Sequence, residues 1–380
     1  MKNKFLFGVV ALSAVLISCK KGTLKKIEST RQKQETAINS ESNSDLKQVV
    51  RDYFERKIAE ESAFETGSNR GSLKQIFIDD KSLVEFSNEV HVNRNINLKE
   101  KTVYCYTKSE VKNINVISKN EKGIIFTVEW EYFANTNKTS FIDGTEIPIS
   151  TSGKDKYLFN LEKDKNGDWR IKHAKNTAFD LLKNEAANLP AGSIKSYDFI
   201  KQESSNLKIS TATYVYNRVA VANYCRNYAM TFNSYYPLFT GSDCTNFASQ
   251  CLKAGGWPNI AGSYSNPRAW NFTKVAGRNV FSHTWIAATK FADLLYYTPS
   301  RAIAQYTSAF GGLQVGDVIS VDFGVTGSVG HNIVVSAKDI YGNLYISCHS
   351  TNRYNKSLNL YIAESAPLIP QPIWYPWKIK

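Results

Sequence analysis

Two cysteines lie seven residues apart in the segment GSDCTNFASQCLKAGG, residues 241–256. A cysteine thiolate is a nucleophile that enzymes use in acyl transfer, so either sulfur could do chemistry. Apolar residues recur at helical spacing from Phe247 to Leu252, and two glycines follow them. This pattern predicts a helix from about residue 244 to residue 254.

The two cysteines occupy different positions on this helix. Ser242 or Asp243 is the natural N-cap, whose side-chain oxygen accepts hydrogen bonds from the first-turn amides. Cys244 therefore opens the helix, where the amides and the helix dipole stabilise a thiolate. Cys251, two turns later and level with Phe247, is predicted to be a small buried hydrophobe. We expect Cys244 to be reactive and Cys251 to contribute packing.

A thiolate nucleophile also needs a base and a group that orients the base. His331 stands at the start of a predicted strand, residues 329–335. A turn centred near Gly342 returns the chain antiparallel, so His331 should lie opposite a residue close to Asn352, with His349 within a pair or two. A slip of one residue exchanges the side chains that share a face with His331, so the register stays open.

This arrangement resembles the papain-like thiol amidohydrolases of bacterial envelopes. Closest is the amidase domain with an Asp-Cys-Thr-Asn-Phe signature, which stands here at residues 243–247, followed by Gln250-Cys251. The NlpC-type and CHAP cell-wall peptidases are more distant relatives. The resemblance covers about residues 211–362 and implies a papain-like fold with Cys244 as nucleophile and His331 as base.

The residue that orients the base has two candidates. His349 and Asn352 stand in one segment, and the family often has an aspartate at the position of Asn352. Asparagine serves this role in papain itself. The resemblance therefore implies a Cys-His-(His/Asn) site with either His349 or Asn352 as the third member.

The oxyanion of the tetrahedral intermediate also needs donors. The resemblance implies the backbone N–H of Cys244 and a second donor from upstream, for which Asn227 and Asn233 are both available. Asp243, directly before the nucleophile, is counted with these substrate-site residues. No Cys-x-x-Cys or His-x-x-x-His pair occurs, so neither a zinc site nor another cofactor is expected.

The amino terminus carries an export signal. Lys2 and Lys4 precede an apolar run over residues 5–17, too short for a comfortable membrane span, and the run closes on Leu-Ile-Ser-Cys at Cys19. Resemblance to bacterial lipoproteins implies removal of residues 1–18 and lipidation of Cys19. We therefore expect the protein in the cell envelope, anchored to a membrane. The alternative is a plain secretory signal in which Cys19 is incidental.

Composition points to the same compartment. Removal of residues 1–18 takes away two lysines and no acids, which lowers the formal charge from +13 to +11. An exported basic protein meets anionic wall polymers and lipid headgroups rather than nucleic acid, although the charge could serve solubility alone. With Cys19 lipidated, five cysteines remain, and an odd number leaves at least one thiol unpaired in an oxidising compartment.

The rest of the chain predicts two α+β domains. Residues 19–44 are polar and form a tether. Residues 45–190 begin with an amphipathic helix and continue with alternating apolar residues, typical of a curved antiparallel sheet, in an order that loosely resembles the nuclear-transport-factor-like cone fold. His91 and His173 in this domain are isolated and are interpreted as ordinary histidines. A polar linker then leads to the amidase domain, residues 205–380.

The sequence thus predicts an envelope-located cysteine amidohydrolase or peptidase that cleaves an amide bond of a peptide or a cell-wall substrate. The alternative is a non-catalytic papain-like binding module tethered to the membrane. The sequence selects neither the substrate, nor the role of the first domain, nor the oligomeric state.

Overall fold

The computed structural model describes residues 41–62, 75–187, 215–297, 302–304, 310–368 and 370–380. The expected signal peptide, Cys19 and the tether up to residue 40 lie outside the described residues. The chain divides into two compact units, residues 1–138 with 148–176 and residues 139–147 with 177–380. Among the described helices, none combines the length and the apolar character that crossing a membrane requires.

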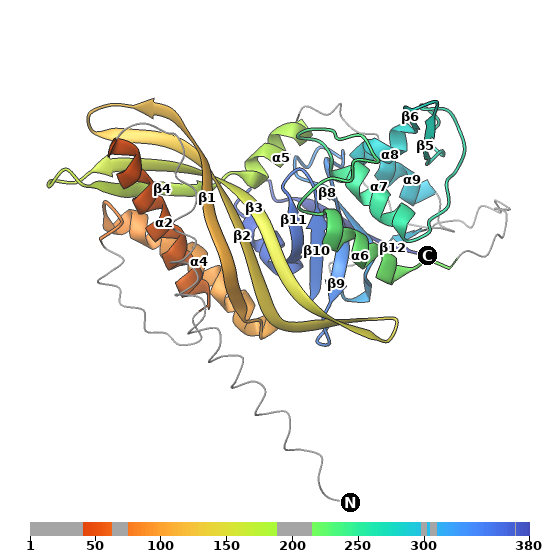
Figure 1. Ribbon diagram of the computed structural model, residues 1–380, viewed down its shortest axis with the longest axis horizontal. Coiled ribbons are helices and arrows are strands. Elements are labelled where there is room, and N and C mark those ends of the chain that lie inside the picture. Colours follow the sequence, from red (N-terminus) through yellow and green to blue (C-terminus); the bar gives the residue numbers. More distant parts are fainter. Residues whose placement is uncertain (1–40, 63–74, 188–214, 298–301, 305–309, 369) are drawn as a thin grey trace, which may run out of the picture. The chain divides into compact units, whose positions relative to one another are not determined.

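The first unit packs two helices with a four-stranded antiparallel sheet, in the order β1-β2-β3-β4. Its elements are α2 (Glu41–Ser62), α4 (Asp80–Glu100), β1 (Tyr104–Lys119), β2 (Gly123–Ile142), β3 (Thr145–Lys163) and β4 (Trp169–Asn176). The β1–β2 register shifts at three places, and such bulges bend a strand pair, as the long curved strands of Figure 1 show.

The sequence pattern of this unit is confirmed in its core. Every second residue from Ile124 to Tyr132 is buried, and Phe54 of α2 stacks on Trp130 at 4.5 Å between ring centroids. The first helix is longer than expected, because it begins at Glu41, inside the stretch interpreted as tether. His91 and His173 are exposed and contact only Asn95 and Glu85 in the described hydrogen bonds.

The second unit is built on a six-stranded antiparallel sheet in the order β11-β10-β9-β8-β12-β7. Its strands are β7 (Ala302–Ala304), β8 (Val318–Asp322), β9 (His331–Lys338), β10 (Leu344–Cys348), β11 (Arg353–Ser357) and β12 (Ile373–Ile379). Its helices are α5 (Ala178–Ala187), α6 (Arg218–Tyr228), α7 (Cys244–Ala254), α8 (His283–Ile286), α9 (Ala288–Tyr297) and α10 (Leu358–Ser365), with a 3-10 turn at Phe310–Gly312. A separate hairpin pairs β5 (Phe272–Val275) with β6 (Arg278–Phe281).

Side chains of β9 alternate between two helical layers. Val334 packs with Phe247 and Cys251 of α7 and with residues of α6. Ile333 and Val335 point to the opposite face and pack with residues of α5 and α10. The fold is therefore mixed α+β, as expected.

Helix α5 corrects the expected domain boundary. The predicted first domain, residues 45–190, includes residues 178–187, but Phe179 and Leu182 pack in the core of the second unit. The reason is that α5 is amphipathic, and its apolar side meets the sheet face that α10 also covers.

Candidate active site

Helix α7 presents the first of the two cysteines at its amino end. The helix runs from Cys244 to Ala254, as predicted, and its first hydrogen bond joins the Phe247 N–H to the Asp243 carbonyl at 2.9 Å. Cys244 is 4% exposed, whereas Cys251 is fully buried against α6. The predicted asymmetry in burial and position between the two sulfurs is therefore present.

All five described cysteines are free thiols. Cys251 lies 3.6 Å from Cys225, sulfur to sulfur, in the α6–α7 interface. Burial, followed by the hydrogen bond with Cys225, raises the pKa of Cys251 well above its usual range. Burial also raises the pKa of Cys348 to about 12, with the Arg353 guanidinium opposing. These two thiols are poor nucleophiles near neutral pH.

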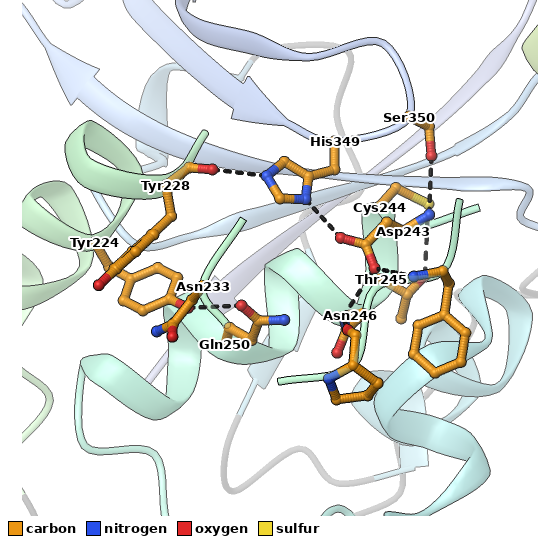
Figure 2. Close-up of polar contacts among 12 residues, drawn as sticks. Tyr224, Tyr228, Asn233, Asp243, Cys244, Thr245, Asn246, Gln250, His349 and Ser350 are labelled. Atoms are coloured by element: carbon orange, nitrogen blue, oxygen red, sulfur yellow. Dashed lines mark hydrogen bonds and ion pairs between the residues drawn. The ribbon is translucent and has the colours of Figure 1, made fainter. Parts of the chain in front are cut away.

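Asp243 occupies the N-cap position but does not cap through its side chain, which corrects the prediction. Its carboxylate instead accepts from the Phe239 N–H at 3.1 Å, from Asn246 Nδ2 at 2.8 Å and from His349 Nδ1 at 2.6 Å (Figure 2). These three donors hold the carboxylate away from the first-turn amides. Asp243 therefore fixes the entry into α7 and is 4% exposed, which makes it a positioning residue.

His349 is held at both ring nitrogens. Nδ1 contacts Asp243, and Nε2 lies 2.7 Å from the Tyr228 carbonyl oxygen (Figure 2). Because the Tyr228 carbonyl oxygen can only accept, Nε2 donates this hydrogen bond. The ring also stacks on Phe247 of α7, 4.2 Å between centroids. His349 thus lies on the α7 side of the sheet, and its contact with Asp243 holds the residue directly before Cys244 in place.

The head of β9 lies beside the amino end of α7. The Gly330 carbonyl oxygen is 4.0 Å from the Cys244 sulfur, and His331 is the next residue. The structure therefore brings the nucleophile candidate and the backbone of the base candidate together from segments 86 residues apart.

The side chain of His331 points to the face away from α7. Asn332 donates from Nδ2 to the Thr245 hydroxyl of α7 at 3.0 Å. Its neighbour His331 alternates to the other face, where its ring centroid lies 6.0 Å from that of Phe323. The charge of Cys244 contributes to raising the pKa of Cys348, which lies on the same face as His331.

His331 is fully buried, and neither of its ring nitrogens has a hydrogen-bond partner among the described residues. Burial, and secondarily the Arg353 guanidinium, lowers the pKa of His331 to about 3. The imidazole is therefore neutral at pH 7, the form that can accept a proton.

Neither expected third residue orients His331, which corrects that part of the prediction. Strand β10 ends at Cys348, and the register pairs Ser347 with Val334. This parity places His349 on the α7 face, opposite His331. The Asn352 backbone carbonyl accepts from Arg353 Nη1 at 3.1 Å.

The two oxyanion candidates have other contacts. Asn227 is exposed, and its carbonyl accepts from the Thr231 hydroxyl at 3.2 Å. The Asn233 amide donates to the Tyr224 hydroxyl at 3.2 Å, and that hydroxyl donates to Gln250 at 2.6 Å (Figure 2). Asn233 thus contacts the Tyr224 hydroxyl that joins α6 to α7.

Sequence reasoning missed Arg353, which is fully buried and lowers the pKa of His331. Its only sequence signal is its place beside Asn352, because burial of an arginine depends on the strands around it. The role of Asn332 was also missed. Its side-chain Oδ1 accepts from the Ser320 hydroxyl at 2.6 Å, and its Nδ2 donates to Thr245, so this side chain connects α7 to the centre of the sheet.

Comparison with known proteins finds one family for the segment that holds this site. Residues 215–368 match the family model described as "Putative amidase domain". The second unit therefore carries an amidase-like domain, which supports a hydrolase that acts on amides at a coarse level.

Two relatives come from Bacillus subtilis (strain 168). The chain is 27% identical to "Uncharacterized protein YjcM" over 169 residues, 42% of this chain and 37% of that protein. It is 29% identical to "Uncharacterized protein YhbB" over 158 residues, 41% of this chain and 49% of that protein. The matches thus span less than half the length of both relatives.

Among solved structures, the chain matches "Crystal structure of intermembrane space region of chloroplast protein ARC6" at 15% identity, over 37% of this chain and 98% of that one. The TM-score of 0.25 is too low for an argument about the fold.

Proposed function

We propose that the second unit is a cysteine amidohydrolase with Cys244 as nucleophile and His331 as base. The observation that carries this proposal is the position of the Cys244 sulfur at the amino end of α7, 4.0 Å from the carbonyl of the residue before His331, within a segment that matches an amidase family. Helix amino ends favour a thiolate and can also stabilise an oxyanion.

The chemistry follows from these groups. Neutral His331 takes the thiol proton, and the Cys244 sulfur forms a bond to the carbonyl carbon of the substrate amide. Backbone amides at the start of α7 stabilise the oxyanion. His331 then gives the proton to the leaving nitrogen as the C–N bond breaks, and water hydrolyses the thioester to release the acid and the thiol.

This mechanism makes a specific demand on His331. A ring nitrogen must move to within hydrogen-bond distance of the Cys244 sulfur, because neither nitrogen has a partner among the described residues. Two unsatisfied ring nitrogens favour such a movement, because a rotation toward a substrate or a thiol removes a desolvation penalty of about 1–3 kcal/mol per group.

We further propose that the protein works in a bacterial cell envelope, anchored through a lipidated Cys19, with a peptide or cell-wall amide as substrate. The support is the lipobox-like end of the apolar run before Cys19 and the basic composition. Four lysines that follow Cys19 would each contribute about 1 kcal/mol near an anionic membrane surface.

A second candidate function is a binding module that keeps the amidase fold without turnover. The observation that favours it is the low pKa of His331, about 3, together with the lack of a described hydrogen bond to its ring. A base with so little proton affinity is inefficient near neutral pH unless a ligand changes its surroundings.

The deciding experiment incubates the full chain with purified cell-wall fragments and reads the products by mass spectrometry. The proposal expects a cleaved amide bond in the wild-type digest and none with Cys244→Ala. A Cys251→Ala variant serves as the matched control and should keep activity, because its thiol is fully buried. Intact fragments with wild-type protein would favour the binding module.

A further inference from the structure

An aromatic surface lies beside the segment that leads to Cys244. We define it by Tyr235, Phe239, Tyr264 and Phe281 together with Lys274. Tyr235 and Tyr264 are each 51% exposed, and this exposed fraction is larger than is usual for large aromatic side chains. The hairpin β5–β6 that carries Lys274 and Phe281 stands at the edge of the second unit, near α8 (Figure 1).

The rings form one connected array. Phe239 meets Phe281 edge to face at 5.8 Å between centroids, and Tyr264 meets the same ring at 6.2 Å. Tyr235 packs on Phe272 at 5.8 Å, and Phe272 pairs across the hairpin with Phe281. Loop and hairpin are therefore held as a single packed surface and not as two separate loops.

This array is physically continuous with the candidate active site. The Phe239 N–H donates to the Asp243 carboxylate at 3.1 Å, and Cys244 is the next residue after Asp243. A chain bound on the aromatic surface would thus run toward the amino end of α7.

The charge of this region is one-sided. No aspartate or glutamate occurs from Cys244 to Ala292, whereas five cations do, namely Lys253, Arg268, Lys274, Arg278 and Lys290. Lys290 is offset by Asp293 at 3.7 Å. Lys274 forms no ion pair with a carboxylate of the described residues, and its ammonium lies 4.5 Å from the ring centroid of Tyr235. An exposed cation is therefore fixed on the aromatic surface without an anion.

We propose that the aromatic surface is a substrate subsite for a peptide that carries carboxylates. The Lys274 ammonium supplies the countercharge, and the exposed rings cover apolar side chains between the acidic ones. A peptide is preferred over other anionic chains because it also brings the amide bond that the nearby thiol would cleave. In that respect the inference rests on the proposed function and names its substrate class.

Binding is tested with the full chain carrying Cys244→Ala, so that no turnover intervenes. The probe is a fluorescein-labelled peptide of Glu-Ala-Leu repeats, compared by anisotropy with its counterpart that has Gln in place of Glu. The acidic peptide should bind at least about fivefold more tightly, and rising salt should weaken its binding selectively.

Variants locate the site. Lys274→Gln should weaken binding of the acidic peptide about threefold, and Tyr235→Ala about fivefold, because each removes one surface contact. Arg278→Gln is the matched control. It makes the same charge change on the same hairpin, but Arg278 pairs with Val275 and therefore points to the opposite face from Lys274. Its effect should stay below about 1.5-fold.

The outcomes separate this inference from the proposed function. Charge-dependent binding that Lys274→Gln weakens, with no hydrolysis by wild-type protein, would support the subsite and reject the enzyme. Equal affinity for the two peptides, or equal loss with Lys274→Gln and Arg278→Gln, would overturn the subsite even if wild-type protein cleaves wall fragments. Tighter binding of a neutral oligosaccharide than of the acidic peptide would overturn it as well.

Discussion

His349 Nδ1 lies 2.6 Å from a carboxylate oxygen of Asp243, although 106 residues separate the two in the chain. Both side chains are almost completely buried, at 4% and 6% exposure. The contact joins the turn after β10 to the residue that directly precedes Cys244. A buried pair of this kind fixes geometry, because loss of one partner leaves a buried polar group without its hydrogen bond.

The Asp243–His349 pair predicts strong thermodynamic coupling. His349→Leu and Asp243→Asn should each lower the free energy of unfolding by about 3 kcal/mol, and the double variant should lower it by little more than either. Urea unfolding of the full chain checks this, with the transitions of the two units fitted separately.

The chain offers a matched control for this pair. His173 lies 3.1 Å from Glu85 with both side chains about half exposed, so His173→Leu should change stability by less than about 0.5 kcal/mol. Additive losses in the Asp243 and His349 variants would show that the buried contact does not act as a pair.

His331 predicts a pH dependence of stability. Its pKa is about 3 in the folded chain against the usual 6.5, so the unfolded chain binds the extra proton between these values. Stability from this group is therefore complete above pH 6.5 and falls as the pH drops, by about 2 kcal/mol at pH 5.

Removal of the imidazole tests this dependence. In His331→Gln, the difference in unfolding free energy between pH 7 and pH 5 should shrink by about 2 kcal/mol relative to wild type. An unchanged pH profile would mean that the His331 ring titrates normally in the folded protein and is not held in the buried position.

Cysteine reactivity gives a chemical prediction. Cys244 opens a helix, while burial raises the pKa of Cys251 and Cys348. Iodoacetamide at pH 7 should therefore alkylate Cys244 at least about tenfold faster than either buried thiol, as followed by peptide mass mapping of the native protein. Equal rates for Cys244 and Cys251 would remove the argument for a special thiol.

Membrane attachment is tested by one substitution. Because only Cys19 follows a lipobox-like sequence, the wild-type protein should fractionate with membranes, and Cys19→Ala should release it into the soluble fraction. Tight membrane association of the Cys19→Ala protein would place the anchor elsewhere in the chain.

Local patterns in the sequence were sufficient for several elements. The helix from Cys244 to Ala254 follows from its apolar spacing, and the alternating residues from Ile124 to Tyr132 lie in a half-buried strand. The position of Cys244 at a helix start beside the head of β9 also follows from such patterns combined with the family resemblance.

The rest of the site depends on which face of the sheet each side chain occupies and on which of several partners each polar group contacts. Local sequence patterns do not contain this information. A register irregularity between Tyr345 and Ile346 decides the pairing of β10 with β9, and with it the face of His349. The Asp243 carboxylate could cap the first turn of α7, but it contacts the imidazole of the distant His349 instead. The spacing of residues in the sequence does not reveal such contacts between side chains from remote segments.

The most direct test of the central claim is the capture of an acyl-enzyme at Cys244. The full chain is mixed with purified cell-wall fragments, quenched in acid within the first turnovers and mapped by peptide mass spectrometry. The account predicts an added acyl mass on the peptide that contains Cys244, labile to hydroxylamine as a thioester is, and absent from Cys244→Ala. Cleavage of the fragments by Cys244→Ala at the wild-type rate would contradict it.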